Sequence, residues 1–167
     1  MNIRLANECD LQRLKEIYTK VVNHMKRENI CIWDDVYPCE FLINDIKGNH
    51  LYLLVEDNNI LGAFALSDSN SGEKYIQWNN PYAKALYIDR FAVNIDYIRQ
   101  GIGGIMLQHA ANITRDRGIE YLRLFVVEEN IPAINLYTKN GFKKLNGVYE
   151  EHIEDFVLRE YGFEMKI

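Results

Sequence analysis

The sequence predicts an α/β or α+β fold in a single domain, with a mixed β-sheet flanked by helices. The chain has 167 residues, the length of one ordinary domain with one hydrophobic core. Two apolar runs at 51–55 and 60–66, separated by a short polar turn, predict an antiparallel hairpin. Apolar strands at 86–93 and 121–127 enclose a helical pattern, which predicts a βαβ unit. Antiparallel and parallel strands are therefore expected together.

The N-terminal region is expected to form a strand followed by a long helix. Residues 2–5 alternate between polar and apolar side chains, as in a short strand. Asn7 and Asp10 are suited to cap the next helix, because their side chains can accept hydrogen bonds from its first N–H groups. Apolar residues then recur at helical spacing, at Leu11, Leu14, Tyr18, Val21 and Met25.

A shorter helix is expected between this long helix and the hairpin. The helical pattern breaks between Asn29 and Cys39, and residues 40–46 can then form a short helix that stops near Gly48. The hairpin turn at 56–59 consists of Glu, Asp, Asn and Asn, which favour turns because they tolerate unusual backbone angles.

The strand at 86–93 leads into a glycine-rich turn and then into a helix. Gly118 is expected to end this helix, and the strand at 121–127 is almost wholly apolar, as in a central strand covered on both faces. The buried stripe of the helix contains Ile102, Ile105, Met106, Ala110 and Ile113.

The C-terminal part combines one more helix with further strands. Pro132 marks the start of a helix that runs to about Lys139, and Gly141 ends it. The chain returns to strand from Phe142. Side chains alternate again at the end of the chain, at Phe163, Met165 and Ile167.

Composition narrows the classes of partner and compartment. The net charge is −5 without a basic cluster, which argues against nucleic acid and fits a cationic substrate. The longest apolar runs are far short of the roughly 20 residues that a membrane span needs, so no membrane association is expected. Three cysteines without CxxC spacing, and no signal-peptide pattern at the N-terminus, predict a cytoplasmic protein. The scattered histidines and cysteines predict no metal site.

The glycine-rich turn has the character of a phosphate-binding loop. A helix start leaves backbone N–H groups without intrahelical partners, and Gly101, Gly103 and Gly104 let an anion approach them. A dinucleotide fingerprint is excluded because Met106 takes the place of its third glycine. A P-loop is excluded because residues 101–115 contain no lysine. The structural alternative is that these glycines only relieve crowding at a tight turn.

A second segment, at 129–142, gives the loop a more specific interpretation. The chain here resembles the pattern N-x-x-A-x-x-L-Y-x-x-x-G-F of the GNAT superfamily of N-acetyltransferases. The matching residues are Asn130, Ala133, Leu136, Tyr137, Gly141 and Phe142. Gly101 and Gly103 match both small residues of the superfamily's Q/R-x-x-G-x-G/A motif, whereas Ile98 departs from its first position. The segment with Trp33, Tyr37 and Pro38 also resembles a small bacterial branch of the superfamily.

The resemblance implies a single N-acetyltransferase domain over 1–167, with a mostly antiparallel sheet and a βαβα segment that binds acetyl-CoA. In the superfamily, backbone groups of one splayed strand hold the pantetheine arm and the thioester oxygen; here these belong to Phe91, Ala92 and Val93. The pyrophosphate would be held by Arg99, Gln100, Gly101, Ile102, Gly103 and Gly104. Further cofactor contacts would come from Asn130, Asn135 and Tyr137. The structural alternatives are an apolar core strand, a solvated Arg99 and an Asn130 that only caps its helix.

The resemblance also suggests the groups that move protons. Tyr137 would act as the general acid, because a hydroxyl with a pKa of about 10 can protonate a leaving thiolate with a pKa of about 8.5. Its structural alternative is a buried tyrosine packed by its ring. The superfamily's glutamate on the strand at 121–127 is replaced by Phe125. Strand alternation puts Asp89 on the face of Phe91, so Asp89 is the predicted base and Glu128 the second choice; either can instead be a salt-bridged structural group.

The acceptor site is expected to border the segment between the first two helices, where Trp33, Asp34, Asp35 and Tyr37 suit a cationic amine. The alternative is an aromatic anchor for an irregular loop. The expected function is transfer of the acetyl group of acetyl-CoA to a primary amine, by direct attack in a ternary complex and without a metal. Acetylation of protein N-termini and a non-catalytic acyl-CoA-binding regulatory module are the alternatives. The expected partners are a small-molecule or peptide amine and, as in many related families, a second copy of the chain.

Overall fold

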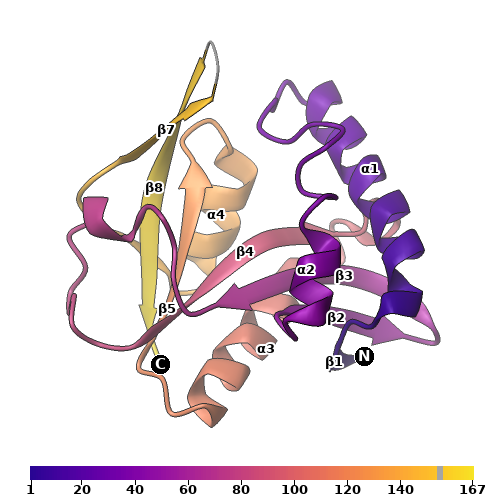
Figure 1. Cartoon of the computed structure of the whole chain (residues 1–167), viewed down its shortest axis with the longest axis horizontal. Coiled ribbons are helices and arrows are strands. Elements are labelled where there is room, and N and C mark those ends of the chain that lie inside the picture. Colours follow the sequence, from indigo (N-terminus) through magenta and orange to yellow (C-terminus); the bar gives the residue numbers. More distant parts are fainter. Residues whose placement is uncertain (154–155) are drawn as a thin grey trace. The chain divides into compact units, whose positions relative to one another are not determined.

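The computed structural model describes residues 1–153 and 156–167 (Figure 1). The chain divides into two compact units, and each is described by itself below. The first unit consists of Met1–Leu66 and Arg90–His109, and the second of Ser67–Asp89 and Ala110–Ile167.

The first unit contains an antiparallel arrangement of three strands. β2 (Leu51–Glu56) pairs on one side with β1 (Asn2–Leu5) and on the other with β3 (Asn59–Ser67). Asp57 and Asn58 both have positive φ angles, 47° and 65°, which is the backbone geometry of a tight two-residue hairpin turn. The predicted hairpin is therefore confirmed, with Asp and Asn at the positions that need this geometry.

Two helices cover one face of these strands. α1 (Leu11–Arg27) is preceded by a short 3₁₀ turn, where Asn7 and Asp10 form the reciprocal capping arrangement that the sequence predicts. α2 (Leu42–Lys47) begins two residues later than predicted and ends at Gly48. The buried core of this unit joins the helices to the strands through Leu14, Ile17, Tyr18, Val21, Leu42, Ile46, Leu51, Leu53, Ala63 and Ala65.

The second unit contains the parallel pairing: Ala85–Ile88 of β4 (Ala85–Val93) run parallel to β5 (Tyr121–Val127). α3 (Ile102–Asp116) follows β4 in the sequence, and its residues from Ala110 on belong to this unit. β5 pairs antiparallel with β8 (Phe156–Lys166), so the mixed, mostly antiparallel sheet is confirmed.

Two further strands and a helix complete this unit. β8 also pairs with β6 (Lys143–Lys144), in the region after Phe142 where the sequence predicts strand. It pairs as well with β7 (Tyr149–Ile153), which the sequence analysis does not anticipate. α4 (Ile131–Lys139) has the predicted bounds, and Gly141 follows it with a φ angle of 92°, the left-handed geometry that favours glycine after a helix.

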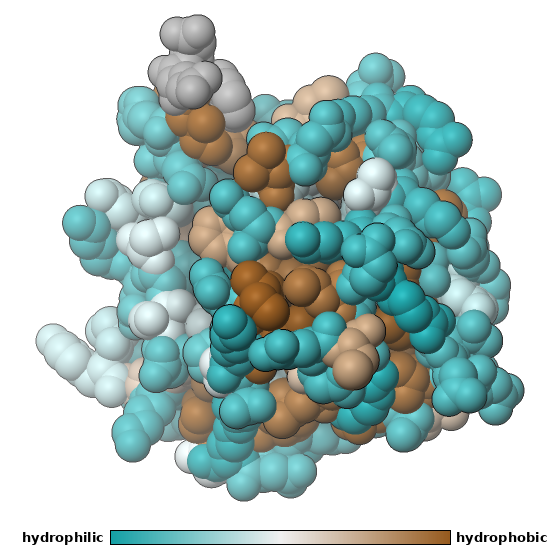
Figure 2. Space-filling model, turned by 45° about the vertical axis from the view of Figure 1, so that its right-hand side comes forward, coloured by the Kyte–Doolittle hydropathy of each residue, from teal (hydrophilic) through white to brown (hydrophobic). Residues whose placement is uncertain are grey.

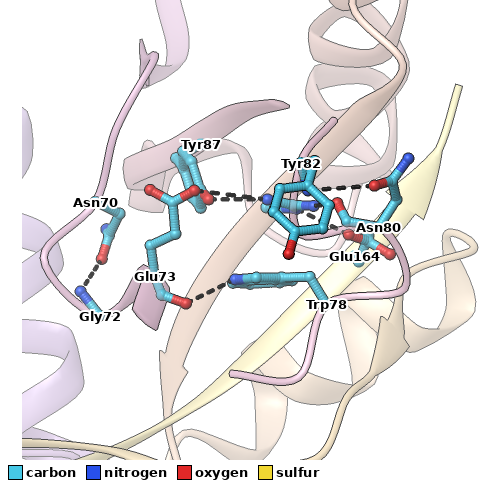
Figure 3. Close-up of polar contacts among 9 residues, drawn as sticks. Asn70, Gly72, Glu73, Trp78, Asn80, Tyr82, Tyr87 and Glu164 are labelled. Atoms are coloured by element: carbon cyan, nitrogen blue, oxygen red, sulfur yellow. Dashed lines mark hydrogen bonds and ion pairs between the residues drawn. The ribbon is translucent and has the colours of Figure 1, made fainter. Parts of the chain in front are cut away.

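A buried charge interrupts the apolar character predicted for β5. The side chain of Arg123 is fully buried and donates to the carboxylate of Glu164 at 2.8 Å and to the carbonyl oxygen of Asn80 at 2.8 Å. It also donates to the Tyr87 hydroxyl at 3.1 Å, and its guanidinium lies 4.4 Å from the ring centre of Trp78. These contacts fasten the connection between β3 and β4 onto β5 and β8 (Figure 3).

On the face drawn in Figure 2, hydrophilic side chains cover most of the surface and hydrophobic ones gather near its centre. Among the helices of the described residues, none combines the length and apolar character that crossing a membrane would require.

Candidate active site

The glycine-rich turn forms the start of α3, as the sequence predicts. Arg99 and Gly101 both have positive φ angles, 61° and 79°, and the Ile105 N–H closes the first helical turn onto the Gly101 carbonyl at 3.2 Å. A Cβ added at Gly101 would have no atom within 4 Å, so open space lies beside the turn. Of the residues predicted to hold the pyrophosphate, Arg99, Gln100 and Gly101 are exposed, Gly104 is half-buried, and Ile102 and Gly103 are buried. Their role in phosphate binding stays a prediction.

The strand that leads into this turn is distorted at Arg90. This residue has a φ angle of 48°, in the left-handed region that a side chain rarely adopts. The hydroxyl of Tyr18 donates to the Arg90 carbonyl at 2.5 Å, and the Arg90 guanidinium forms two hydrogen bonds with Asp45, at 2.6 and 2.9 Å. Side chains of α1 and α2, both in the first unit, thus stabilise the left-handed conformation of Arg90.

This distortion corrects one argument from the sequence. Alternation along a regular strand was the reason for expecting Asp89 on the face of Phe91, and the left-handed Arg90 between them breaks that alternation. Alternation does hold on the N-terminal side of Arg90, so Asp89 shares the face of Tyr87 instead. Asp89 as the base stays a prediction, now without that support.

The residues after the distortion belong to the strand core of the first unit. Phe91 stacks on Phe64 with ring centres 6.2 Å apart, and Ala92 is buried. Val93 is half-buried, and the Asn94 N–H that follows donates to the Leu61 carbonyl of β3 at 2.9 Å. Their structural role is thus confirmed, and their predicted contacts with pantetheine are untested.

Tyr137 is a buried side chain of α4. Its ring packs against those of Phe142 and Phe163, with centres 6.0 and 6.5 Å apart. Burial, and secondly the negative charge of Asp89, raise the pKa of the Tyr137 hydroxyl well above its usual value. The hydroxyl therefore keeps its proton across the physiological pH range, as a proton donor must.

Asn130 and Asn135 have different environments at α4. The Asn130 side chain accepts a hydrogen bond from the Ala133 N–H at 3.3 Å and caps the helix, which is compatible with either role. Asn135 is exposed on the same helix. Their predicted contacts with the cofactor stay predictions.

We expect Asn130→Ala to lower the free energy of unfolding by about 1 kcal/mol, the usual effect of losing an N-terminal cap. Urea denaturation of the two proteins measures this loss. Asn135→Ala is the matched control, because the exposed Asn135 makes no cap; an equal loss in both variants would contradict the prediction.

The acidic residues of the second unit differ in whether a cation neutralises them. Glu128, the second candidate base, pairs with Arg159 at 3.0 Å and accepts a hydrogen bond from the Tyr161 hydroxyl at 2.9 Å. It is therefore a salt-bridged structural group. Glu160, which the sequence analysis does not single out, lies on β8 opposite Val127. Burial first, and then the charges of Glu151 and Asp89, raise the pKa of Glu160 to about 7.

No signal in the sequence distinguishes Glu160 from the other acidic residues around it. The environment of Glu160 depends on the register of β8 with β5 and with β7. Neither register can be derived from the sequence of a single strand.

The segment expected to border the acceptor site forms an aromatic series in the first unit. The rings of Tyr18, Trp33, Tyr37 and Phe41 follow one another with centres 5.9, 6.1 and 5.5 Å apart. The Asp34 carboxylate accepts hydrogen bonds from the N–H groups of Val36 and Tyr37, both at 2.7 Å, and these bonds lower its pKa. The alternative of an anchored loop is thus observed, and acceptor binding by Trp33, Asp34 and Tyr37 stays a prediction.

Asp35, from the same segment, forms an ion pair with Lys26 at 3.0 Å. In residues 1–153 and 156–167, no group of three or more His, Cys, Asp or Glu side chains is arranged to hold a metal ion.

The mixed, mostly antiparallel sheet with its parallel β4–β5 pair and flanking helices is the fold of the GNAT acetyltransferases. Residues 14–142 match the profile of the Acetyltransferase (GNAT) family, so the chain belongs to this family and is an acetyltransferase.

Three similar proteins each match this chain over almost its whole length. It is 26% identical over 171 residues to "Putative phosphinothricin acetyltransferase YwnH" of Bacillus subtilis (strain 168), with 99% of each chain covered. A GNAT-family acetyltransferase from Streptococcus agalactiae 2603 has a similar crystal structure, with a TM-score of 0.83 and 16% identity over 99% of this chain and 95% of that one. The structure of yncA from Salmonella typhimurium, solved with its cofactor acetyl-CoA, has a TM-score of 0.71 at 17% identity, over 99% and 93% of the chains.

Proposed function

We propose that this acetyltransferase transfers the acetyl group of acetyl-CoA to a primary amine of a small molecule, by direct attack in a ternary complex. The observation that carries this proposal is Tyr137, which matches the superfamily's motif tyrosine and is buried near Asp89 with a raised pKa. The name of the Bacillus relative supports a small-molecule acceptor over a protein N-terminus.

The cofactor is held chiefly by backbone groups. The N–H groups of 99–104 bind the pyrophosphate, because the start of α3 offers unpaired donors and the positive end of its dipole. Backbone groups of 91–93 hold the pantetheine arm, with Asn130 and Asn135 as side-chain contacts. The binding of acetyl-CoA by yncA, which has the same fold, supports this assignment.

The chemistry needs one group that gives a proton and one that takes a proton. The neutral amine nitrogen attacks the thioester carbonyl carbon, and a C–N bond forms as the C–S bond breaks. The Tyr137 hydroxyl donates its proton to the departing sulfur. A carboxylate of the second unit takes the proton that the amine loses, and Asp89 is the group that the sequence predicts for it. The aromatic and acidic residues Trp33, Asp34 and Tyr37 recognise the acceptor as a cation.

The direct test measures binding and turnover separately. Calorimetry with acetyl-CoA reports binding, and thiol release reports transfer to a panel of phosphinothricin, alkyl diamines, free amino acids and short peptides. We expect binding, and turnover with small amines. Binding without turnover on any amine would identify a non-catalytic acyl-CoA-binding module, and turnover of peptides alone would identify an N-terminal acetyltransferase.

We expect Gly101→Ala to weaken acetyl-CoA binding at least about ten-fold, the equivalent of one lost hydrogen bond to a charged group. The added methyl group would occupy the open space beside the turn, where the pyrophosphate is proposed to bind. Calorimetry measures the loss.

Gly118→Ala is the matched control. Gly118 also has a positive φ angle, 66°, with open space at its Cβ position, but it ends α3 instead of preceding it. Both substitutions should therefore lower the stability similarly, by about 1 to 2 kcal/mol for a side chain in the left-handed region. Equal acetyl-CoA affinities in the two variants would contradict the assignment of the turn.

A further inference from the structure

Glu160 lies on β8, the middle strand of a three-stranded part of the second unit. It is opposite Val127 of β5 on one side and opposite Tyr149 of β7 on the other. Its side chain is half-buried, and alternation along β8 puts it on the same face as Gly162 and Glu164. Figure 1 shows β7 and β8 running side by side at this point.

The charges that act on Glu160 most strongly are those of two carboxylates. Glu151 of β7 and Asp89 of β4 both act on it with like charge. From β5 it faces the apolar Val127. Within 1–153 and 156–167, the Glu160 carboxylate has no arginine, lysine or histidine as an ion-pair partner.

Two other buried or half-buried glutamates of this unit, Glu128 and Glu164, are neutralised. Glu164, four residues further along the same face, is paired with the buried Arg123 at 2.8 Å. Glu128 is paired with Arg159 at 3.0 Å, and Arg159 also pairs with Glu150 of β7. These two carboxylates are thus each paired with an arginine, whereas Glu160 is not paired with one. Desolvation of a carboxylate without a cation is unfavourable, so this arrangement is unusual.

We infer that Glu160 is the general base, the carboxylate that takes the proton from the acceptor amine. This inference rests on the proposed acetyl transfer. The acceptor binds as an ammonium ion; one of its N–H bonds breaks, and the proton moves to a Glu160 oxygen and on to solvent, which leaves a neutral nitrogen to attack. As the C–N bond forms, a second N–H bond breaks, and its proton replaces the one that Tyr137 gives to sulfur. Asp89 and Glu151 are positioning residues, because their charges set how tightly Glu160 holds that proton.

The proton affinity of Glu160 suits this task. Its pKa of about 7 means that the carboxylate is available near neutral pH and still binds a proton well. An ordinary glutamate, with a pKa of about 4.3, would be a much weaker base.

The kinetic test compares pH profiles of kcat/KM for acetyl-CoA and the fastest amine of the panel. For the wild type we expect activity to rise up to about pH 7 and then level off. Glu160→Gln should lose about a hundred-fold at pH 7. Its activity should then climb ten-fold per pH unit towards the pKa of the amine, about 10.4 for an alkylamine, because only amine already neutral in solution can react.

Two neighbours on β7 provide matched variants. Glu151→Gln removes a like charge that acts on Glu160, so the rise in activity should shift to lower pH. Glu150→Gln removes a carboxylate from the opposite face of the same strand and should leave the profile unchanged.

The Tm of the Glu160→Gln variant at pH 8 distinguishes a base from a structural carboxylate. Loss of a structural carboxylate would lower this Tm, whereas loss of a desolvated base should raise it. Unfolded Glu160 ionises at its ordinary pKa, whereas the folded protein holds the proton up to about pH 7, so stability falls as pH rises between these values. Glu160→Gln should therefore have a higher Tm than the wild type at pH 8, with the difference vanishing towards pH 4.

Three results would overturn the inference. One is a Glu160→Gln profile that still rises to a plateau near pH 7, and another is a lower Tm of this variant at pH 8. The third is an Asp89→Asn variant that alone shows the steep climb, which would make Asp89 the base. If the wild type acetylates amines in these cases, the assignment of Glu160 as the base is wrong but the proposed acetyl transfer stands. If the wild type neither binds acetyl-CoA nor releases thiol, the proposed function fails with it.

Discussion

Replacing Arg123 by methionine is expected to lower the free energy of unfolding by about 3–5 kcal/mol, the usual result of removing one partner of a buried ion pair. The substitution leaves the Glu164 carboxylate buried without its cation, because the side chains of both residues are at most 1% exposed. It also leaves the Asn80 carbonyl without its donor. Urea denaturation measures the loss.

The double variant Arg123→Met with Glu164→Leu separates the charge effect from packing. Because it leaves no buried charge unpaired, it should be more stable than Arg123→Met alone. A loss below about 1 kcal/mol in Arg123→Met, or a double variant less stable than the single one, would contradict this account of the pair.

Tyr137→Phe is expected to lower kcat by about a hundred-fold or more while the KM for acetyl-CoA changes little. Phenylalanine keeps the ring that packs on Phe142 and Phe163, so the fold is preserved and only the hydroxyl is lost. Steady-state thiol release at saturating acceptor measures the change. A kcat within two-fold of the wild type would exclude Tyr137 as the general acid.

Tyr87→Phe is the matched control for this variant. Tyr87 is also buried, and burial raises the pKa of its hydroxyl to about 12. This hydroxyl accepts a hydrogen bond from Arg123 and belongs to the buried ion-pair cluster. Its loss should lower stability by about 1 kcal/mol without the hundred-fold effect on kcat. The two tyrosines therefore distinguish loss of a buried hydroxyl from loss of the proton donor.

Local signals in the sequence predicted most of the secondary structure. The spacing of apolar residues predicted α1, and the pair Asn7 and Asp10 predicted how the chain enters it. The bounds of β5 and α4 agree with the prediction, because Gly118 ends the helix before β5 and Pro132 marks the start of α4. Such signals act within a few residues, so one chain displays them completely.

The motifs also identified the family correctly, because their residues lie close together in sequence. The segment from Asn130 to Phe142 lies on a single helix and its exit, so its spacing directly encodes geometry. The glycine turn before α3 was predictable for the same reason.

Long-range pairings were not predictable. Arg123 interrupts an apolar strand, and nothing near it indicates that Glu164, 41 residues away, neutralises it. The left-handed Arg90 of β4 was missed because its support comes from Tyr18 of α1 and Asp45 of α2, which are distant in the sequence. The strand alternation used for Asp89 failed at this position.

The sequence by itself determined the elements, the family and the residue types available for chemistry. Only the tertiary structure decided which acidic side chains carry a neutralising cation: Glu128 and Glu164 have one, whereas Glu160 lies among carboxylates. The physical reason is that the charge state of a carboxylate depends on desolvation and on its neighbours in space. Strand register sets both, and it brings together residues far apart in the chain.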